Sequence, residues 1–596
     1  MDIDSRQLAL GDYFHQYRAS FGISLRKAAG DVVSAGQLSR FERGNSKFST
    51  DTTLKLMHRL GMMVNDFVNL DENNPYAFPV FNGLMWSSDF EKINDRITAY
   101  RKAHVDDPVT PLKDVMAVLF ACAREPITST LRLDITQEYA LSDFLAYPRY
   151  WHTAEVGMII HASLFSSTEF RQQCWARLPE FDASGEYLNE RLMVRLSLLI
   201  GAIKFGEWAT FTAHLPEILA QMEDDEKLEA FGAKKTIAIL LKLIGQWHAA
   251  GMPADYPPIT ALLQAVAAVG GKKEVPYLKS IWQMAQQPAP ATHHSLQDVR
   301  EKLTVKPETD NQPFSGIKMA MLRERRHLAQ NQVNLAWSAS AQNRFENGQT
   351  QLRLAHMDVL KDFLLSGWVD LINTNYNFHV NLFAHYREKI TQEYYAGTLT
   401  GETAQALVDQ YYQDSTDLAE PVRQVQKLEL LQYAYTGIDD PMPDDIRAEV
   451  RRALEQMPGW NGDYISLFSD GAMWLPAAES YKMWRSVYGL TRDERIHVSN
   501  PTAADLSVAL SIAREHDVKL AQAMLDDMPS VRKRSGAAWL NMWSINLFLA
   551  AKVCAWTINA PKPEEVDRYL DQMKLVGYGR EAEAARGYLA ELGMQV

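Results

Sequence analysis

Two similar segments lie about half the chain apart, and this repeat restricts the possible folds more than any other feature of the sequence. Residues 34–44 read SAGQLSRFERG and residues 338–348 read SASAQNRFENG, an offset of 304 in a chain of 596 residues. A similar offset persists further on, because Trp151 and Trp460 are 309 apart. Internal repeats indicate that one structural unit recurs. We therefore predict two diverged copies of one unit, at about 1–290 and 310–596.

Within each copy, apolar residues recur with a helical period. Leu188, Leu192, Leu196 and Leu199 are three or four residues apart, and strand-like alternation of Val, Ile and Thr is missing. We predict an all-α fold in which each copy has a small helical head and a larger helical-repeat domain similar to tetratricopeptide repeats. An irregular helical bundle remains the alternative. The predicted boundaries are 1–70 for the first head, 84–285 for its repeat domain, 286–313 for a linker, 314–374 for the second head and 380–596 for its repeat domain.

The composition is that of a globular cytoplasmic protein. Hydrophobic residues make up 46% and charged residues 23%, which excludes wholesale disorder. Three scattered cysteines exclude a disulfide framework, and the N-terminal sequence does not resemble a signal peptide. The most apolar stretch, Met542–Ile558, contains polar residues and is interpreted as a buried helix, so no membrane association is predicted.

The segment 10–69 predicts a five-helix head that contains a helix-turn-helix. Leu10, Phe14 and Tyr17 share one face of a first helix, and Ser24 is placed to cap a short second helix. Ser34 caps a third helix that Gly44 ends, with Leu38 and Phe41 facing inward. Two further helices are expected at about 51–60 and 63–69.

The outward residues of this head suit duplex DNA. Arginine and glutamine side chains can hydrogen-bond base edges in the major groove, whereas Arg, Lys, Ser and helix N-terminal amides hold phosphates. We expect base contacts from Gln37, Ser39 and Arg40, and phosphate contacts from Arg18, Arg26, Lys27, Ser34 and Arg43. Residues 1–70 hold nine Lys/Arg against seven Asp/Glu, and residues 311–374 hold seven against five. The remainder of the chain therefore carries a formal charge of −17, which brings the whole chain to −13.

The second head has lost most of this surface. Ala341, Asn343 and Asn347 replace Gln37, Ser39 and Arg43, whereas Arg344 is retained. Gln342 replaces the inward Leu38. A buried glutamine without a partner costs a few kcal/mol, so we expect a rotated helix or looser packing. The second head is predicted either to contact phosphates only or to have lost DNA binding.

The string S-x-x-Q-L-S-R-F-E-R-G of residues 34–44 resembles the Rgg/GadR/MutR group of Gram-positive regulators, within the XRE-type helix-turn-helix class. Residues 137–164, QEYALSDFLAYPRYWHTAEVGMIIHASL, are similar to the signature with which the repeat domain of that family begins. The resemblance covers the first copy throughout and the second more weakly. It implies transcription regulation, a repeat domain that senses a short hydrophobic peptide, as in quorum sensing, and homodimers of single-copy chains.

Two classes of function follow. The first is a DNA-binding regulator, a single-chain pseudo-dimer that recognises an asymmetric operator and senses a ligand on the first repeat domain. We place the ligand anchors at Asn189, Arg191 and Arg195; the alternative is that the two arginines are simply solvated. The second class is a scaffold with relic heads. Because motifs for nucleotide, metal and nucleophile chemistry are missing, no catalytic residue, metal or cofactor is predicted. Further pairing of whole chains remains open.

Overall fold

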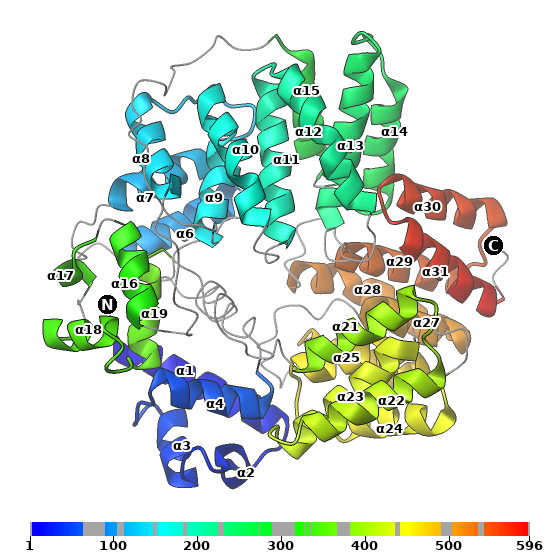
Figure 1. The fold of residues 1–596 in the computed structure, drawn as a ribbon. Coiled ribbons are helices and arrows are strands. Elements are labelled where there is room, and N and C mark those ends of the chain that lie inside the picture. The colour runs from blue at the N-terminus through cyan, green and yellow to red at the C-terminus, as the bar shows by residue number, and fades with distance from the viewer. Residues whose placement is uncertain are drawn as a thin grey trace.

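The chain folds as an assembly of α-helices, seen in Figure 1. The computed structural model describes residues 3–62, 90–103, 112–146, 151, 153–182, 188–223, 232–272, 274–288, 316–326, 328–333, 337–365, 382–435, 442–489, 504–534 and 542–593. Within these ranges there is no β-strand, and the predicted all-α class is confirmed. No helix in the same ranges combines the length and apolarity needed to cross a bilayer.

Two small helical heads have the same order of helices. The first contains α1 (Ile3–Ser20), α2 (Leu25–Ala29), α3 (Ala35–Glu42) and α4 (Thr50–Leu60). The second contains α16 (Gly316–Arg325), α17 (Gln330–Val333), α18 (Ala339–Glu346) and α19 (Leu354–Phe363). The predicted inward residues Leu10, Phe14, Tyr17, Leu38 and Phe41 are all buried. The expected fifth helix at 63–69 lies outside the described residues, as do both predicted head-to-repeat boundaries and 289–313 of the linker.

A larger helical domain follows each head. The first repeat domain contains α6 (Phe90–Ala103), α7 (Leu112–Ala123), α8 (Ile135–Ala146), α9 (Thr153–Ala162), α10 (Thr168–Asp182), α11 (Leu188–Lys204), α12 (Trp208–Glu223), α13 (Gly232–Ala249), α14 (Pro257–Ala268) and α15 (Val275–Gln286). The second contains α21 (Leu382–Tyr395), α22 (Gly401–Asp414), α23 (Glu420–Tyr435), α24 (Asp444–Glu455), α25 (Gly462–Gly471), α26 (Ala477–Val487), α27 (Ala504–Arg514), α28 (Val518–Arg534), α29 (Met542–Ile558), α30 (Pro563–Leu575) and α31 (Gly579–Glu591).

Within each repeat domain, helices pack on their sequence neighbours and also on the next helix but one. In the first domain α7, α9, α11, α13 and α15 follow one another in contact, and in the second α21, α23, α25, α27 and α29 do the same. Stacked layers of this kind are the packing of helical-repeat solenoids rather than of an irregular bundle. The apolar stretch at 542–558 is α29, with Ile545, Ala550 and Cys554 completely buried.

The two halves of the chain contact each other at both ends. At the heads, Ser49 and Arg353 form an isolated antiparallel bridge, and α19 packs on α1 and α4. At the far ends α14 packs on α30, and the Thr236 hydroxyl donates to the carbonyl of Val576 at 3.0 Å. Ser49 and Arg353 are 304 residues apart, which equals the offset between the two similar sequence segments. Contacts between corresponding positions are what a local two-fold axis produces.

Each head also lies against the repeat domain of the opposite half. In Figure 1 the first head borders the second repeat domain near α23, and the second head borders the first repeat domain. The amide of Ala419, just before α23, donates to the carbonyl of Arg59 at 2.9 Å. In the other half, the buried Arg326 at the end of α16 is ion-paired with Glu155 of α9. The heads and repeat domains are thus crossed between the halves.

Candidate nucleic-acid interface

Helix α3 is held at both ends by side-chain and backbone caps. Ser34 accepts from the amide of Gln37 at 3.2 Å, and the Gln37 side-chain carbonyl accepts from the amide of Ser34 at 2.9 Å, which completes a capping box. At the other end Gly44 has φ 72°, and the amides of Gly44 and Asn45 donate to the carbonyls of Phe41 and Arg40 at 2.8 Å. This left-handed closure is a Schellman motif, as expected for glycine.

The outer face of α3 and the adjoining α2 carries exposed polar and basic side chains. Exposed are Arg26 and Lys27 on α2, and Ser34, Gln37, Arg40 and Arg43 at or on α3, whereas Ser39 is half-buried. The Arg40 guanidinium makes no hydrogen bond or ion pair with the described part of the chain. The Arg43 guanidinium donates to the carbonyl of Ser39 at 3.1 Å, which holds it along the helix. Arg40 is therefore the exposed cation of α3 most available to a ligand.

The capping box restricts what Gln37 can recognise. Bidentate recognition of adenine requires both the carbonyl and the amino group of a glutamine. Because the carbonyl already accepts from Ser34, only the amino group can donate outward without breaking the cap. Gln37 in this geometry fits a hydrogen-bond acceptor such as O6 or N7 of guanine.

Gly36 makes the beginning of α3 accessible to a large ligand. A Cβ placed on Gly36 would meet no heavy atom within 4 Å. Glycine inside a helix costs roughly 0.5–1 kcal/mol relative to alanine, and core packing does not require it at this position. A bare backbone beside Ser34 and Gln37 permits close approach of a phosphate or a base edge.

Arg18 is placed differently from the prediction. Its guanidinium donates to both carboxylate oxygens of Glu42, at 2.7 and 2.9 Å, and to the carbonyl of Ile23 at 2.6 Å. Glu42 is 8% exposed, so this pair ties α1 to α3 inside the head. A phosphate contact would require Arg18 to leave a buried carboxylate, and we withdraw it from the phosphate-contacting set.

The second head repeats this internal network. Arg323 donates to both oxygens of Glu346, at 2.7 and 2.8 Å, and to the carbonyl of Leu328 at 2.6 Å. Burial raises the pKa of Glu346, but the bonds from Arg323, Gln342 and Gln330 outweigh burial, so that the pKa is lowered overall. The arginine–glutamate bonds that join α1 to α3 therefore recur between α16 and α18.

Gln342 corrects the expectation of a costly buried amide. The residue is 1% exposed, its amino group donates to Glu346 at 2.7 Å, and its carbonyl accepts from the indole N–H of Trp337. Because both ends of the amide are satisfied, neither a rotated helix nor looser packing is needed. Ser338 caps α18 as Ser34 caps α3, and Gly348 closes the helix with φ 71°.

On the outer face of α18, Arg344 is exposed as predicted. Asn347 donates to Asn343 within the same helix, at 2.9 Å to its carbonyl and 3.1 Å to its side chain. Arg323 and Arg326, two of the basic residues that give the second head its positive charge, both form buried ion pairs. The second head therefore offers less free positive charge than its sequence indicates.

Two basic residues at the junction of the heads were missed by sequence reasoning. Burial first, and then the nearby charges of Arg353 and Lys47, lower the pKa of His356 to about 4. Lys47 belongs to the first head and Arg353 to the second, beside the bridge from Ser49. Lys47 and Arg353 each follow the capped helix of their own head, and this position in the sequence could have indicated them. They add positive charge where the two heads meet.

The proposed ligand anchors on α11 are only partly in position. Arg195 is 1% exposed and its guanidinium lies 3.2 Å from Glu217 of α12, so it is neither solvated nor open to a groove. Arg191 is half-buried, and the side chain of Asn189 lies outside the described residues. Since an anchor must present its polar group to an open surface, Arg195 is withdrawn as a ligand anchor.

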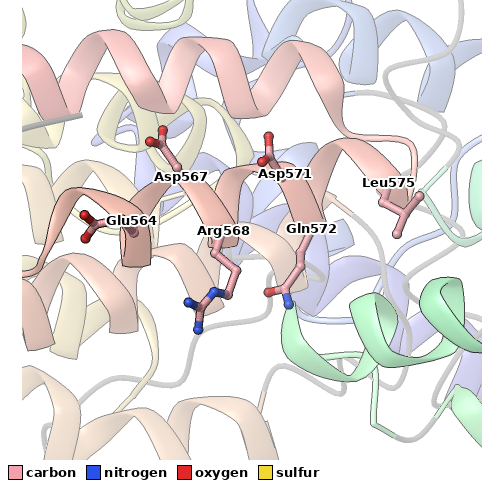
Figure 2. Close-up of a pocket in the computed structure, with 6 residues that line it drawn as sticks. All are labelled: Glu564, Asp567, Arg568, Asp571, Gln572 and Leu575. Carbon is pink, nitrogen blue, oxygen red and sulfur yellow. The ribbon is translucent and has the colours of Figure 1, made fainter.

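A hollow of about 450 Å³ lies along α30, away from the heads in Figure 1. Figure 2 shows the side chains that line this hollow, namely Glu564, Asp567, Arg568, Asp571, Gln572 and Leu575. Asp567 is held by Arg586 at 2.7 Å. The acidic lining disfavours nucleic acid there. Among the described residues, no group of three His, Cys, Asp or Glu side chains is placed to hold a metal ion.

Comparison with protein-family models, curated proteins and solved structures finds no match to this chain.

Proposed function

We propose that the chain is a sequence-specific DNA-binding transcription regulator, built as a single-chain pseudo-dimer of two diverged copies. The observation that carries this proposal is the exposed face of α3, where Arg40 is free of described partners, the Gln37 amino group is available and Gly36 leaves the backbone open. A helix capped at both ends that presents donors outward suits the major groove. The Rgg-type resemblance points to the same function.

The matching networks of the two heads support the duplication. Arg18–Glu42–Ile23 and Arg323–Glu346–Leu328 use the same atoms at positions 304 or 305 residues apart. In this proposal the first head reads bases and the second, with Arg344, at most holds the backbone. The operator is then asymmetric, because only one head carries the base-reading residues.

The repeat domains are proposed to sense a small ligand, and a short hydrophobic peptide is the candidate that the family resemblance implies. On the first repeat domain, Arg191 remains as an anchor beside the buried Leu192 and Leu199. Hydrogen exchange with and without a candidate peptide tests this assignment. Protection that spares 188–203 on addition of an activating peptide would contradict the placement.

The DNA-binding proposal is tested on the intact chain with duplexes selected from a random pool. Replacing Arg40 by alanine is expected to weaken binding to the selected duplex by about 1–3 kcal/mol, because a bidentate base contact is lost. The plot of log affinity against log salt should slope steeply downward for the wild type. The control is Arg452→Ala, which removes an exposed arginine of α24, outside both heads. Unchanged affinity for both Arg40→Ala and Gln37→Ala, or a flat salt dependence, would favour the scaffold alternative.

A further inference from the structure

The first head meets α25 of the second repeat domain through an uncharged contact, whereas elsewhere on the same interface His58 of α4 is paired with Asp417, just before α23. Phe21, at the end of α1, packs on Tyr464 of α25 with ring centroids 5.6 Å apart, and the two residues are 3% and 6% exposed. Beside them, the Asn461 amide donates to the Ser20 hydroxyl at 2.9 Å. The first head is therefore anchored on α25 by an aromatic pair and a neutral hydrogen bond.

The second head meets the first repeat domain through a charged contact. Arg326, at the end of α16, is ion-paired with Glu155 of α9, and both side chains are completely buried. The Arg326 guanidinium also lies 3.9 Å from the centre of the Phe144 ring and donates to the carbonyl of Leu364 at 3.3 Å. This interface has a desolvated cation and anion at its centre.

The two contacts occupy corresponding positions. Arg18 and Arg323 have identical partners and are 305 residues apart, which makes Arg326 the counterpart of Phe21. Helices α9 (Thr153–Ala162) and α25 (Gly462–Gly471) are 309 residues apart at both ends, which makes Tyr464 the counterpart of Glu155. Corresponding positions of the two interfaces thus hold an Arg–Glu pair in one and a Phe–Tyr pair in the other.

We propose that these two pairs determine which repeat domain each head docks on. Uncrossed docking, with each head on the repeat domain of its own half, would place Phe21 against Glu155 and Arg326 against Tyr464. Each of those contacts would bury a charge without its counterion, which is strongly unfavourable. Specificity of this kind arises from repulsion in the wrong pairing as much as from attraction in the right one.

The two docking pairs, Arg326–Glu155 and Phe21–Tyr464, also affect how a ligand can control the heads. The first head is committed to the second repeat domain and the second head to the first. A ligand that changes the second repeat domain therefore acts directly on the head that carries Arg40, whereas a ligand held by α11 acts first on the other head. The docking proposal itself does not depend on DNA binding.

The test exchanges Phe21 and Arg326, the docking residues of the two heads, in the full chain. Spin labels at Arg43→Cys in the first head and Arg452→Cys in the second repeat domain report the crossed docking as one distance. Because the native Cys122, Cys174 and Cys554 are buried, the labels report only the introduced sites. With Phe21→Arg and Arg326→Phe together, both pairs match the uncrossed arrangement, so the wild-type distance should no longer dominate.

The decisive variant adds Glu155→Tyr and Tyr464→Glu, which moves each pair intact to the opposite interface. We expect the wild-type distance to be recovered, with amide exchange in 153–162 within about threefold of the wild-type rate. The same result is expected even if the two-residue variant alone fails to fold. The matched control is Phe21→Leu, which keeps the contact with Tyr464 uncharged and should retain crossed docking. Wild-type docking in the two-residue exchange, or failure of the fourfold variant to restore it, would overturn the proposal.

Discussion

At the scale of single residues, the interiors of the two heads are determined by polar groups that find partners far away in the sequence. Glu42 and Glu346 are each 8% exposed and each receives an arginine from the first helix of its head. Removal of one partner from a buried ion pair costs more than the pair contributes, because the remaining charge stays desolvated. The arginines at these positions are therefore expected to matter more for folding than for ligand contact.

Replacing Arg323 by methionine is expected to destabilise the second head by about 3–5 kcal/mol at pH 7, because Glu346 keeps its charge without a counterion. Since the pKa of Glu346 is lowered in the folded protein, its pairing stabilises the fold at neutral pH, and this contribution is lost as the pH falls through the folded pKa. The cost of the substitution should therefore shrink in acid. Amide exchange of 339–346 at pH 7 measures the loss. Arg344→Met, on the exposed face of the same helix, is the control and should change stability by less than about 0.5 kcal/mol.

At the scale of elements, one pair of packed helices buries polar side chains in the second repeat domain where the first repeat domain has apolar ones. The packed pair α23 and α25 buries Glu429 and Gln432, where the corresponding residues of α7, 309 residues earlier, are Phe120 and Ala123. The Glu429 carboxylate accepts from Ser466 of α25 at 2.5 Å. Taking a carboxyl and an amide out of water costs free energy that their hydrogen bonds must offset. The pair on which the first head rests is thus the more sensitive of the two to the loss of a polar partner.

Glu429 should make the stability of the second repeat domain depend on pH. Burial, with a smaller contribution from Asp470, raises its pKa to about 7 against the bond from Ser466 and the charge of Arg387. A carboxyl with a raised folded pKa stabilises the fold least when it must ionise, so stability should fall as the pH rises from about 4.5 to above 7, by roughly 3 kcal/mol in all.

Glu429→Gln keeps an acceptor for Ser466 but cannot ionise, and this part of the pH dependence should disappear. Denaturant unfolding at pH 5.5 and pH 8 compares the two proteins, and the wild type should lose about 2 kcal/mol more than the variant between them. The exposed Glu402→Gln of α22 is the control. Equal pH dependence in wild type and Glu429→Gln would show that this carboxyl is not ionising in the folded domain.

At the scale of the whole molecule, the two halves contact each other both at their heads and at the C-terminal parts of their repeat domains. The heads meet at the bridge from Ser49 to Arg353, and the C-terminal parts meet where α14 packs on α30. Gly270, with φ 104°, lies so close to Phe548 that a Cβ there would be 2.0 Å from the ring. Linking the two halves in one chain gives them a high effective concentration, so their pairing does not depend on expression level.

The chain is expected to remain a single copy in solution, because its own halves occupy the surfaces that a two-fold dimer would use. Light scattering of the purified protein should give a mass near 67.6 kDa over a wide concentration range. A stable species of twice that mass would indicate that a further surface pairs whole chains. Gly270→Val is the informative variant, since a larger side chain against Phe548 should loosen the C-terminal contact without altering the heads.

Local features of the sequence determined the helices and their caps. The Ser34 cap, the Gly44 closure, the buried faces at Phe14 and Phe41, and helix 542–558 were all predicted and are confirmed, because each depends on residues within about four positions along the chain. The exposed set around Arg40 followed from the same periodicity. Its role in reading DNA stays a prediction.

The partners of buried polar groups were decided only by the tertiary structure. Arg18 was expected at a phosphate and lies on Glu42, Gln342 was expected to lack partners and is satisfied by Trp337 and Glu346, and Arg195 is buried beside Glu217. The crossed docking was not foreseen, since Glu155 and Arg326 are joined across 171 residues. Helical periodicity shows which face of a helix is inward, but it carries no information about which distant element supplies the opposing charge.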